Sequence, residues 1–414
     1  MGPAVGDAAA SEADDPRAAA GSRRYRRALI ALFCAGLATF AQMYSPQGIL
    51  PDIAREFGVA AGASSWAVGA TTIGVAVGVL PWARASDRFG RVPTMRLALA
   101  AAMLVGLVTP FAPGFELFIA ARLLEGFALA GLPAIAVTTI AETVRPFALG
   151  GAVGTYIAGT TIGGLVGRII AAEVGEPFGW RWGMAAVAVL AAVATIVFLV
   201  RIPPTAVPPG PSRPIPSAVL ANLRTPGVMV LVAQAFLMMG GFVAAYNYLA
   251  FRLQHEPFGL TLAQTSWIFL AYLAGAATSR WVWPLTRGIP PTRVLLGCVG
   301  IMLAGIALTL LPSLPGVILG IVLFTGSFFA AHSIANGLIE RRASADGRSL
   351  APPLYTLGYY AGSSLLGWFG GVAFGWGGWA GTVLMVAGAT LAAGLLAWGY
   401  ARANGGTAAV DLRP

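Results

Sequence analysis

The segment FGVAAGASSWAVGATTIGVAVGVLPW, residues 57–82, returns in the second half of the chain as FGLTLAQTSWIFLAYLAGAATSRWVW, residues 258–283. Each matching residue of the second copy is numbered 201 higher, in a chain of 414 residues. The matches are Phe57, Gly58, Ser65, Trp66, Gly74 and Trp82 with Phe258, Gly259, Ser266, Trp267, Gly275 and Trp283. Both segments are mostly apolar. The chain is therefore built from two related halves that run in the same direction.

A second echo, offset by 203 positions, supports this division. It links Tyr156, Ala158, Gly159 and Gly164 with Tyr359, Ala361, Gly362 and Gly367. Thr160-Thr161 is answered by Ser363-Ser364, and Phe178-Gly179-Trp180 by Phe374-Gly375-Trp376.

The composition indicates a membrane protein. Hydrophobic residues make up 57% of the chain and charged residues 10%, with a mean hydropathy of +0.77, whereas soluble domains carry about 25% charged residues. Windows of about 20 apolar residues recur, each long enough to cross a bilayer as a helix. The predicted spans are residues 28–50, 64–85, 94–113, 115–138, 147–172, 180–200, 227–251, 265–285, 292–312, 315–336, 350–375 and 377–400. We predict an all-α integral membrane fold of about twelve helices in two pseudo-symmetric six-helix bundles.

Two same-direction repeats in a membrane are typical of secondary transporters, because two bundles can rock about a shared midplane site. A membrane-embedded enzyme would need a polar catalytic cluster. No metal-spaced His/Cys/Asp set, Walker loop or Gly-x-Ser-x-Gly elbow is present. These absences favour a transporter without ATP hydrolysis and predict no cofactor and no metal. Cys34 and Cys298 lie inside predicted spans, so no disulfide framework is expected.

The formal net charge of +10 follows the topology rather than indicating nucleic-acid binding. Arginines gather before the first span, after the second, between the halves and in later loops of the same parity. Loops of the opposite parity hold only Arg55, Arg181 and Arg252, offset by acidic residues. By the positive-inside rule, we expect both termini in the cytoplasm of a bacterial cell and the chain in its inner membrane.

The composition along the chain also predicts its domain boundaries. We expect a disordered N-terminal tail over 1–22, a six-helix bundle over 23–200, a Pro-rich cytoplasmic linker over 201–226, a second bundle over 227–400 and a C-terminal tail over 401–414.

The loop after the second span reads Ala83-Arg84-Ala85-Ser86-Asp87-Arg88-Phe89-Gly90-Arg91. It resembles the Gly-x-Leu-x-Asp-Arg-x-Gly-Arg loop of the major facilitator superfamily, with Ala83 and Ala85 in place of Gly and Leu. Together with the repeat, the resemblance covers roughly residues 25–400. It implies that Asp87 and Arg91 latch the cytoplasmic side in the outward-facing state, with Arg88 and Gly90 in the same gate. The alternative is that Arg88 and Arg91 only anchor the topology.

The fourth span contains Arg122-Leu123-Leu124-Glu125-Gly126. Ionisable groups inside lipid are costly and mark functional sites by default, and the i, i+3 spacing allows Arg122 and Glu125 to pair. The motif resembles the superfamily's fourth-helix Arg-x-x-x-Gly, whose arginine is linked to proton coupling in the drug:proton antiporter branch. Glu125 is the better proton carrier, because a carboxylate titrates and Arg does not. A static ion pair is the alternative.

The fifth span is rich in small residues that permit close helix packing. It resembles the antiporter branch's Gly-Pro-x-x-Gly-Gly motif, but Thr160 stands where that motif has Pro. In this departure the chain resembles the arabinose-efflux-permease-like members of the branch. Arg168 lies nearer the outer end of this span. It is either a functional charge inside the membrane or a residue that snorkels to the surface or pairs with Glu173.

His332 is the only histidine inside a span and is a candidate second coupling group, with Asn336 one turn away on the same face. A satisfied hydrogen-bond partner is the alternative. Polar residues of the first and seventh spans are expected to line a central substrate cavity. These candidates are Gln42, Tyr44, Gln47, Gln234, Tyr246 and Asn247, together with Thr160 and Asn336.

We therefore predict a monomeric transporter that exports a small organic compound by proton-coupled alternating access, with the lipid bilayer, the substrate and protons as its partners and no nucleic acid. The balance of charges inside the membrane favours neutral or anionic substrates over lipophilic cations. An importer or uniporter of a sugar or organic acid has the same architecture, and a non-transporting membrane sensor is the remaining alternative.

Overall fold

The computed structural model describes residues 17–205, 220–344 and 350–404. The predicted tails and linker, residues 1–22, 201–226 and 401–414, lie largely outside these ranges. The described part is helical, with one isolated bridge between Ala18 and Val144 as its only β interaction.

The described part of the first half contains nine α-helices and three 3₁₀ helices. They are α2 (Arg23–Tyr44), α3 (Leu50–Phe57), α4 (Ala61–Ser64), α5 (Trp66–Phe89), α6 (Arg91–Val108), α7 (Phe115–Leu129), α8 (Ala136–Thr143), α9 (Leu149–Phe178) and α10 (Trp180–Arg201), with the 3₁₀ helix η1 (Ser45–Gly48) between α2 and α3. Two further 3₁₀ turns are η2 (Thr109–Phe111) and η3 (Pro146–Ala148).

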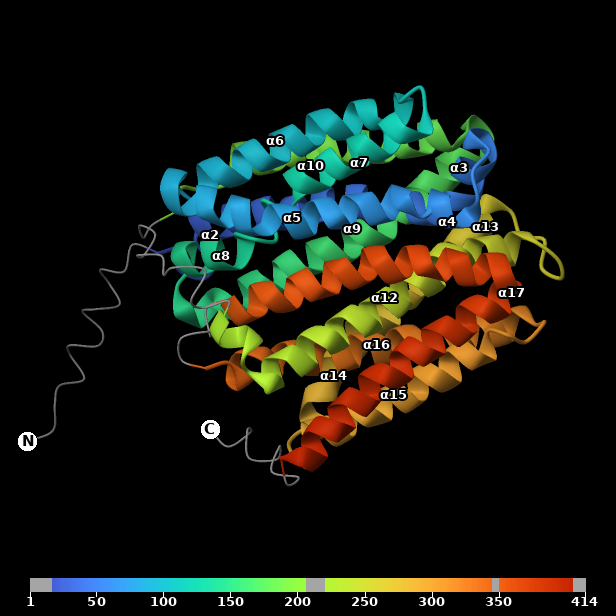
Figure 1. Cartoon of the computed structure of the whole chain (residues 1–414). Coiled ribbons are helices and arrows are strands. Elements are labelled where there is room, and N and C mark those ends of the chain that lie inside the picture. Colours follow the sequence, from blue (N-terminus) through green and yellow to red (C-terminus); the bar gives the residue numbers. More distant parts are fainter. Residues whose placement is uncertain (1–16, 206–219, 345–349, 405–414) are drawn as a thin grey trace, which may run out of the picture.

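The second half repeats the pattern. Its helices are α12 (Pro226–Gln254), α13 (Leu262–Ser266), η4 (Trp267–Ala271), α14 (Tyr272–Leu285), α15 (Pro291–Leu308), α16 (Leu314–Arg342) and α17 (Ala351–Ala403). Two consecutive glycines bend α17 back on itself, because Gly377 and Gly378 leave the helical conformation and Gly378 has a φ of 56°. We call residues 351–376 its first limb and residues 379–403 its second limb. Figure 1 shows the two limbs running in opposite directions.

Nine helices of the described part are long and apolar enough to cross a membrane, counting α17 once. The fourth predicted span is not one continuous helix: α7 ends at Leu129, and residues 130–135 form turns before α8. Pro133 has no N–H to donate, which favours such a break. The first span likewise ends as a helix at Tyr44, where Pro46 opens η1, and the eighth begins with the short α13 and η4.

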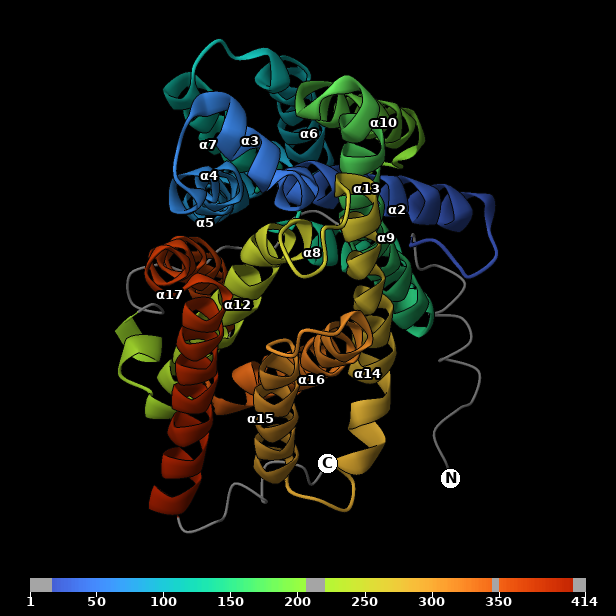
Figure 2. The same ribbon diagram turned by 90° about the vertical axis from the view of Figure 1, so that its right-hand side faces the viewer.

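The two halves form separate helical layers, α2–α10 and α12–α17 (Figure 2). Glycines at matching positions of the repeat allow close helix packing in each half. A Cβ on Gly159 of α9 would lie 2.3 Å from the carbonyl oxygen of Phe33 in α2. A Cβ on Gly362 of α17 would lie 2.0 Å from that of Phe236 in α12. In both halves, therefore, the absence of a side chain lets two helix backbones touch.

The halves meet toward one end of the molecule. Thr72 bonds Ser364 at 2.6 Å, and the Ala263 N–H donates to Glu176 at 2.6 Å. A Cβ on Gly371 would lie 2.2 Å from Gly62 Cα. We call this the closed end, on the right in Figure 1, and the opposite end, which holds residues 83–91, the latch end. The start of α2 and the end of α17 both lie at the latch end, on the left of Figure 1.

Candidate functional site

A buried ion pair occupies α7. Arg122 donates to Glu125 Oε2 at 2.6 Å, and their side chains are only 1% and 2% exposed. The spacing of three residues places both on one helix face, as the sequence predicts. Because the pair lies inside a membrane-spanning bundle, neither charge is screened by bulk water.

Arg122 also ties three helices together. Its Nε donates to the Ala67 carbonyl in α5 at 2.8 Å. Its Nη2 donates to the carbonyls of Gln42 and Met43 in the last turn of α2, at 3.1 and 2.9 Å. The guanidinium therefore fixes the end of α2 against α7 and α5.

Gln42 completes the site on the carboxylate's other side. With its amide nitrogen turned toward α7, it donates to Glu125 Oε1 at 3.0 Å and to the Ala102 carbonyl at 3.3 Å. Gly106 leaves the room for this contact, because a Cβ there would lie 2.0 Å from the Gln42 amide and 3.1 Å from Glu125 Oε1. Gln42 therefore contacts Glu125, the candidate proton carrier.

The predicted gate is assembled within the first half. Arg91 donates to Asp87 at 2.7 Å, to Ser86 Oγ at 2.7 Å and to Glu142 at 3.3 Å. Gly90 has a φ of 89°, which permits the sharp turn from α5 into α6. Ser86 and Glu142 were not predicted, and no spacing in the sequence could have indicated Glu142, because it comes from α8.

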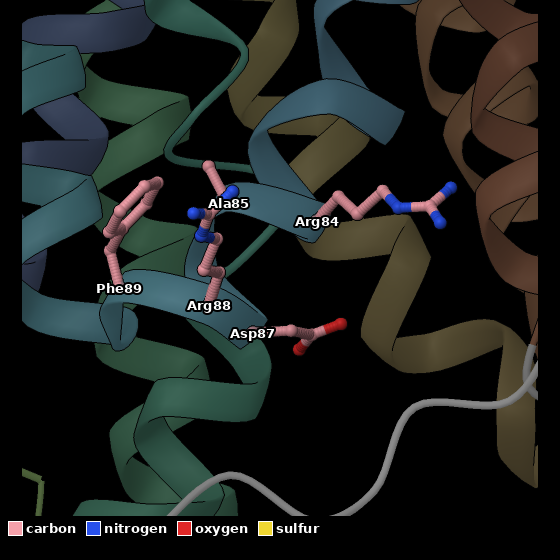
Figure 3. Close-up of a pocket in the computed structure, with 5 residues that line it drawn as sticks. All are labelled: Arg84, Ala85, Asp87, Arg88 and Phe89. Carbon is pink, nitrogen blue, oxygen red and sulfur yellow. The ribbon is translucent and has the colours of Figure 1, made fainter.

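A hollow of about 470 Å³ lies beside this loop and is lined by Arg84, Ala85, Asp87, Arg88 and Phe89. Figure 3 shows Arg84 and Asp87 extending to one side of α5 and Phe89 to the other. Arg88 lies over the Phe89 ring at 5.2 Å. None of the hydrogen bonds and ion pairs found for Asp87 and Arg91 in the described ranges reaches the second half.

A second buried arginine lies between the halves. Arg168 of α9 is 1% exposed and donates to Gln47 Oε1 at 2.8 Å and to the Tyr272 hydroxyl at 3.1 Å. Gln47 in turn donates to Asn247 at 2.8 Å. The expectation that Arg168 snorkels or pairs with Glu173 is wrong, because its side chain turns inward to groups of η1 and α14.

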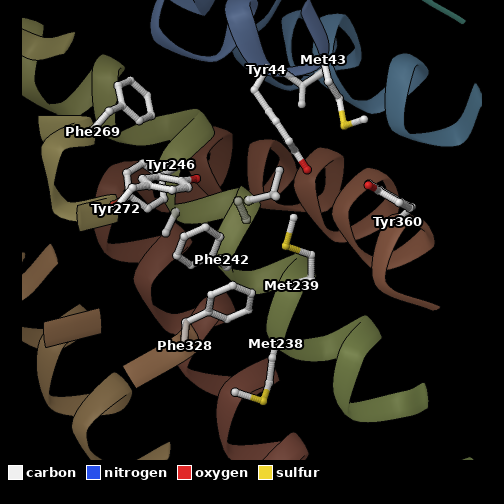
Figure 4. Packing of buried hydrophobic residues seen from close by; sticks show 14 of the residues in the cluster. Met43, Tyr44, Met238, Met239, Phe242, Tyr246, Phe269, Tyr272, Phe328 and Tyr360 are labelled. Atoms are coloured by element: carbon white, nitrogen blue, oxygen red, sulfur yellow. The ribbon is translucent and has the colours of Figure 1, made fainter. Parts of the chain in front are cut away.

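Aromatic rings lie around the Arg168 guanidinium, and Figure 4 shows those of Tyr44, Phe269 and Tyr272. Tyr44 extends from α2 toward the second half, and the Tyr246 ring stacks on Phe269 at 5.3 Å between centroids. Tyr246 also bonds Thr325 at 2.6 Å. Tyr44, Gln47, Tyr246 and Asn247 thus lie close together between the two halves.

The other predicted lining residues lie elsewhere. Gln234 donates to the Ala393 carbonyl of the second limb of α17, inside the second half. Thr160 is half-buried in α9 and bonds the Ile157 carbonyl at 2.8 Å. Asn336 is exposed on α16. These three residues are not part of the group around Arg168.

His332 of α16 belongs to an aromatic group. Its Nδ1 lies 2.8 Å from the Tyr355 hydroxyl, and its ring lies 5.0 Å from that of Tyr359 and 5.9 Å from that of Phe328. These three partners are neutral side chains. Within the described residues, no group of three or more His, Cys, Asp or Glu could hold a metal ion, and both cysteines are free.

Comparisons with known proteins agree with this architecture. The model of the Major Facilitator Superfamily matches residues 29–351. The MFS-type transporter YybF of Bacillus subtilis (strain 168) is 33% identical over 369 residues, covering 88% of this chain and 91% of the relative. The inner membrane transport protein YnfM of Escherichia coli (strain K12) is 35% identical over 365 residues, covering 86% and 87%.

Solved structures show the same fold at low sequence identity. A bacterial homolog of the human lysosomal transporter Spinster, inward-facing and unoccupied, superposes with a TM-score of 0.69 at 14% identity, covering 94% of this chain and 97% of that chain. A mutant of the nucleoside transporter NupG gives 0.73 at 14% identity, covering 90% and 99%. The prediction of a transporter rather than an enzyme is confirmed by these relatives. The chain belongs to the major facilitator superfamily and is a multi-pass membrane transporter.

Proposed function

We propose that this transporter exports a small organic compound in exchange for protons, as the drug:proton antiporter branch and its arabinose-efflux-permease-like members do. The observation that carries the proposal is the Arg122–Glu125 pair. Glu125 is the one fully buried carboxylate among the residues whose side chains the structure describes. A buried carboxylate in a transporter is a group that can take up a proton on one side of the membrane and release it on the other.

Protonation of Glu125 acts on the helices through Arg122. When Glu125 takes up a proton, it loses its charge and with it the Coulomb attraction for the guanidinium. Arg122 also holds the Gln42 and Met43 carbonyls, so this change reaches the end of α2. That segment carries Tyr44 and Gln47 into the contact between the halves. Proton binding is thus linked to the interface that must open during transport.

The latch provides the gate for the opposite state. In this conformation Arg91 holds Asp87 and Glu142 within the first half, while the closed end is sealed by bonds between the halves. We propose that the closed end opens when the Asp87 loop engages the second half. His332 is a secondary coupling candidate. Tyr44, Gln47, Tyr246 and Asn247 line the substrate site, whereas Gln42 contacts the proton carrier.

We place the chain in a bacterial inner membrane with both termini and the latch end in the cytoplasm. The arginines of the latch end support this orientation, and YnfM is named an inner membrane protein. A cysteine introduced at exposed Arg88 should react with a membrane-impermeant maleimide only in permeabilised cells. One introduced at exposed Arg55 should react in intact cells, and the reverse pattern would invert the topology.

The proposed coupling is tested in proteoliposomes that contain a trapped pH-sensitive dye, with sugars, organic acids and hydrophobic drugs as the panel. The wild-type protein should move protons when its substrate is added. Glu125→Gln should lose this flux and keep substrate exchange. Glu116→Gln is the matched control, since Glu116 lies in the first turn of the same helix but is exposed.

The outcomes separate the candidates. Unchanged coupling in Glu125→Gln would overturn the assignment of the proton carrier. Loss of coupling in His332→Gln but not in Glu125→Gln would transfer the role to His332. Substrate flux without any proton movement would show a facilitator and contradict the proposed antiport.

A further inference from the structure

The two buried arginines of this protein differ in how their charges are balanced. Arg122 is paired with Glu125. Arg168 is equally buried, and no carboxylate of the described chain lies within ion-pair distance of it. Its hydrogen-bond partners are the Gln47 amide, the Gly164 carbonyl and the Tyr272 hydroxyl, all of them neutral. A buried cation without a counter-charge is costly in a membrane protein.

The guanidinium also has donors to spare. Arg has five N–H bonds, and three of those of Arg168 are used in the contacts above. The remaining two, one on each Nη, have no acceptor among the described residues. A planar fork of free N–H groups matches the two oxygens of a carboxylate.

Aromatic rings enclose the rest of the group. The Arg168 guanidinium carbon lies 4.6 Å from the centroid of the Tyr44 ring, 4.7 Å from that of Tyr272 and 5.0 Å from that of Phe269. Such rings offset part of the cost of the charge. They also provide apolar surface beside it, which suits a ligand with one charged group and an apolar body.

The enclosure is contributed by both halves. Tyr44 and Gln47 come from the first half, and Phe269 and Tyr272 from the second. Any movement that separates the halves at the closed end must therefore uncover Arg168. A residue that is covered in one state and uncovered in the other is placed as a substrate site needs to be in alternating access.

We propose that Arg168 binds the substrate and that the substrate is a small organic monocarboxylate with an apolar body. The proposal rests on the transport function argued above and names its substrate class. The charges of Arg122, Glu125 and Arg168 leave one positive charge uncompensated, and one carboxylate neutralises it. The Arg168 site also adjoins the proton site, because Tyr44, whose ring packs on the Arg168 guanidinium, directly follows Gln42 and Met43, whose carbonyls accept hydrogen bonds from Arg122.

The test uses the full chain in lipid nanodiscs and needs no transport. Thermal unfolding is measured with benzoate, phenylacetate and hexanoate, each compared with its neutral amide. At least one acid should raise the melting temperature of the wild-type protein, while its amide does not. Arg168→Gln should lose this preference. Arg168→Lys, which keeps the charge but not the fork, should bind the acid about tenfold more weakly.

A matched control is Arg181→Gln. Arg181 also lies at the closed end over aromatic rings, but it is paired with Glu56. This variant should bind the acid as the wild-type protein does. Equal stabilisation by acid and amide, no stabilisation by any acid of the panel, or unchanged acid binding in both Arg168 variants would overturn the proposal.

Failure of this proposal is distinguishable from failure of proton coupling. Glu125→Gln should keep acid binding that depends on Arg168, because Glu125 does not contact that site. Acid binding without proton flux would leave the substrate site standing and contradict the antiport. Proton flux that neutral compounds drive in Arg168→Gln would support the antiport and contradict the carboxylate site.

Discussion

At the scale of single residues, Arg122 and Glu125 are held so tightly that removing one should be worse than removing both. An unpaired buried charge costs about 3–5 kcal/mol, whereas replacing a whole buried pair by apolar residues is often neutral. Arg122→Met leaves Glu125 without its cation and frees two carbonyls at the end of α2.

We expect Arg122→Met to destabilise the protein by about 3 kcal/mol and to lower its thermal unfolding midpoint in detergent. The double variant Arg122→Met/Glu125→Leu should regain most of that stability, yet it should have no proton coupling. A double variant as unstable as the single one would show that Arg122 is needed for its backbone contacts rather than for its charge balance.

The sequence predicts part of this residue-scale picture. The pairing of Arg122 with Glu125 follows from spacing on one helix, which is local information. The surroundings of Arg168 do not, because Tyr44, Gln47, Phe269 and Tyr272 come from four separate elements and meet only in the folded chain. The expected contact with Glu173 was the local alternative, and tertiary contacts replaced it.

At the scale of helices, glycine contacts control how closely elements approach. Gly371 in the first limb of α17 faces Gly62 in α4, and a Cβ on Gly371 would lie 2.2 Å from Gly62 Cα and 2.4 Å from the Tyr248 hydroxyl. A side chain there cannot be accommodated while the closed end stays closed.

Gly371→Val should therefore push the halves apart at the closed end. Spin labels at exposed Arg55 and Glu256 should report a distance several ångströms longer than in the protein with glycine, an estimate based on the size of the clash. Gly375→Val, one turn along the same limb and in open space, should leave the distance unchanged. No lengthening in Gly371→Val would mean that this contact does not hold the closed end.

Hydropathy predicts the helices well and their breaks poorly. Every predicted span contains helix, because a segment in lipid must satisfy its backbone N–H and C=O groups with its own hydrogen bonds. The stop of α7 at Leu129 was missed, since an average over twenty residues does not register one proline. The local rule was available in Pro133, and likewise in Pro46 at the end of α2.

At the scale of the whole molecule, the internal repeat explains the two halves, and the matching contacts of Gly159 and Gly362 show that they are built alike. The sequence could not predict which end is closed. A transporter must reach both states with the same residues, so the free energies of the two packings are close, and the repeat fits either one.

We propose that three features work together: the proton site at Glu125, the arginine site at Arg168 and the closed end. If they act together, the protonation of Glu125 must change which end of the molecule is open. A label pair at Arg55 and Glu256 reports on the closed end, and a pair at Arg88 and Arg287, all of them exposed, reports on the latch end.

The most direct measurement is the distance within both label pairs, in nanodiscs at acidic and at alkaline pH, in the wild-type protein and in Glu125→Gln. We predict that the two distances change in opposite directions with pH in the wild-type protein and stay fixed in Glu125→Gln. Distances that do not change with pH in the wild-type protein would contradict proton-coupled alternating access through Glu125. Distances that change with pH by the same amount in Glu125→Gln would contradict it too.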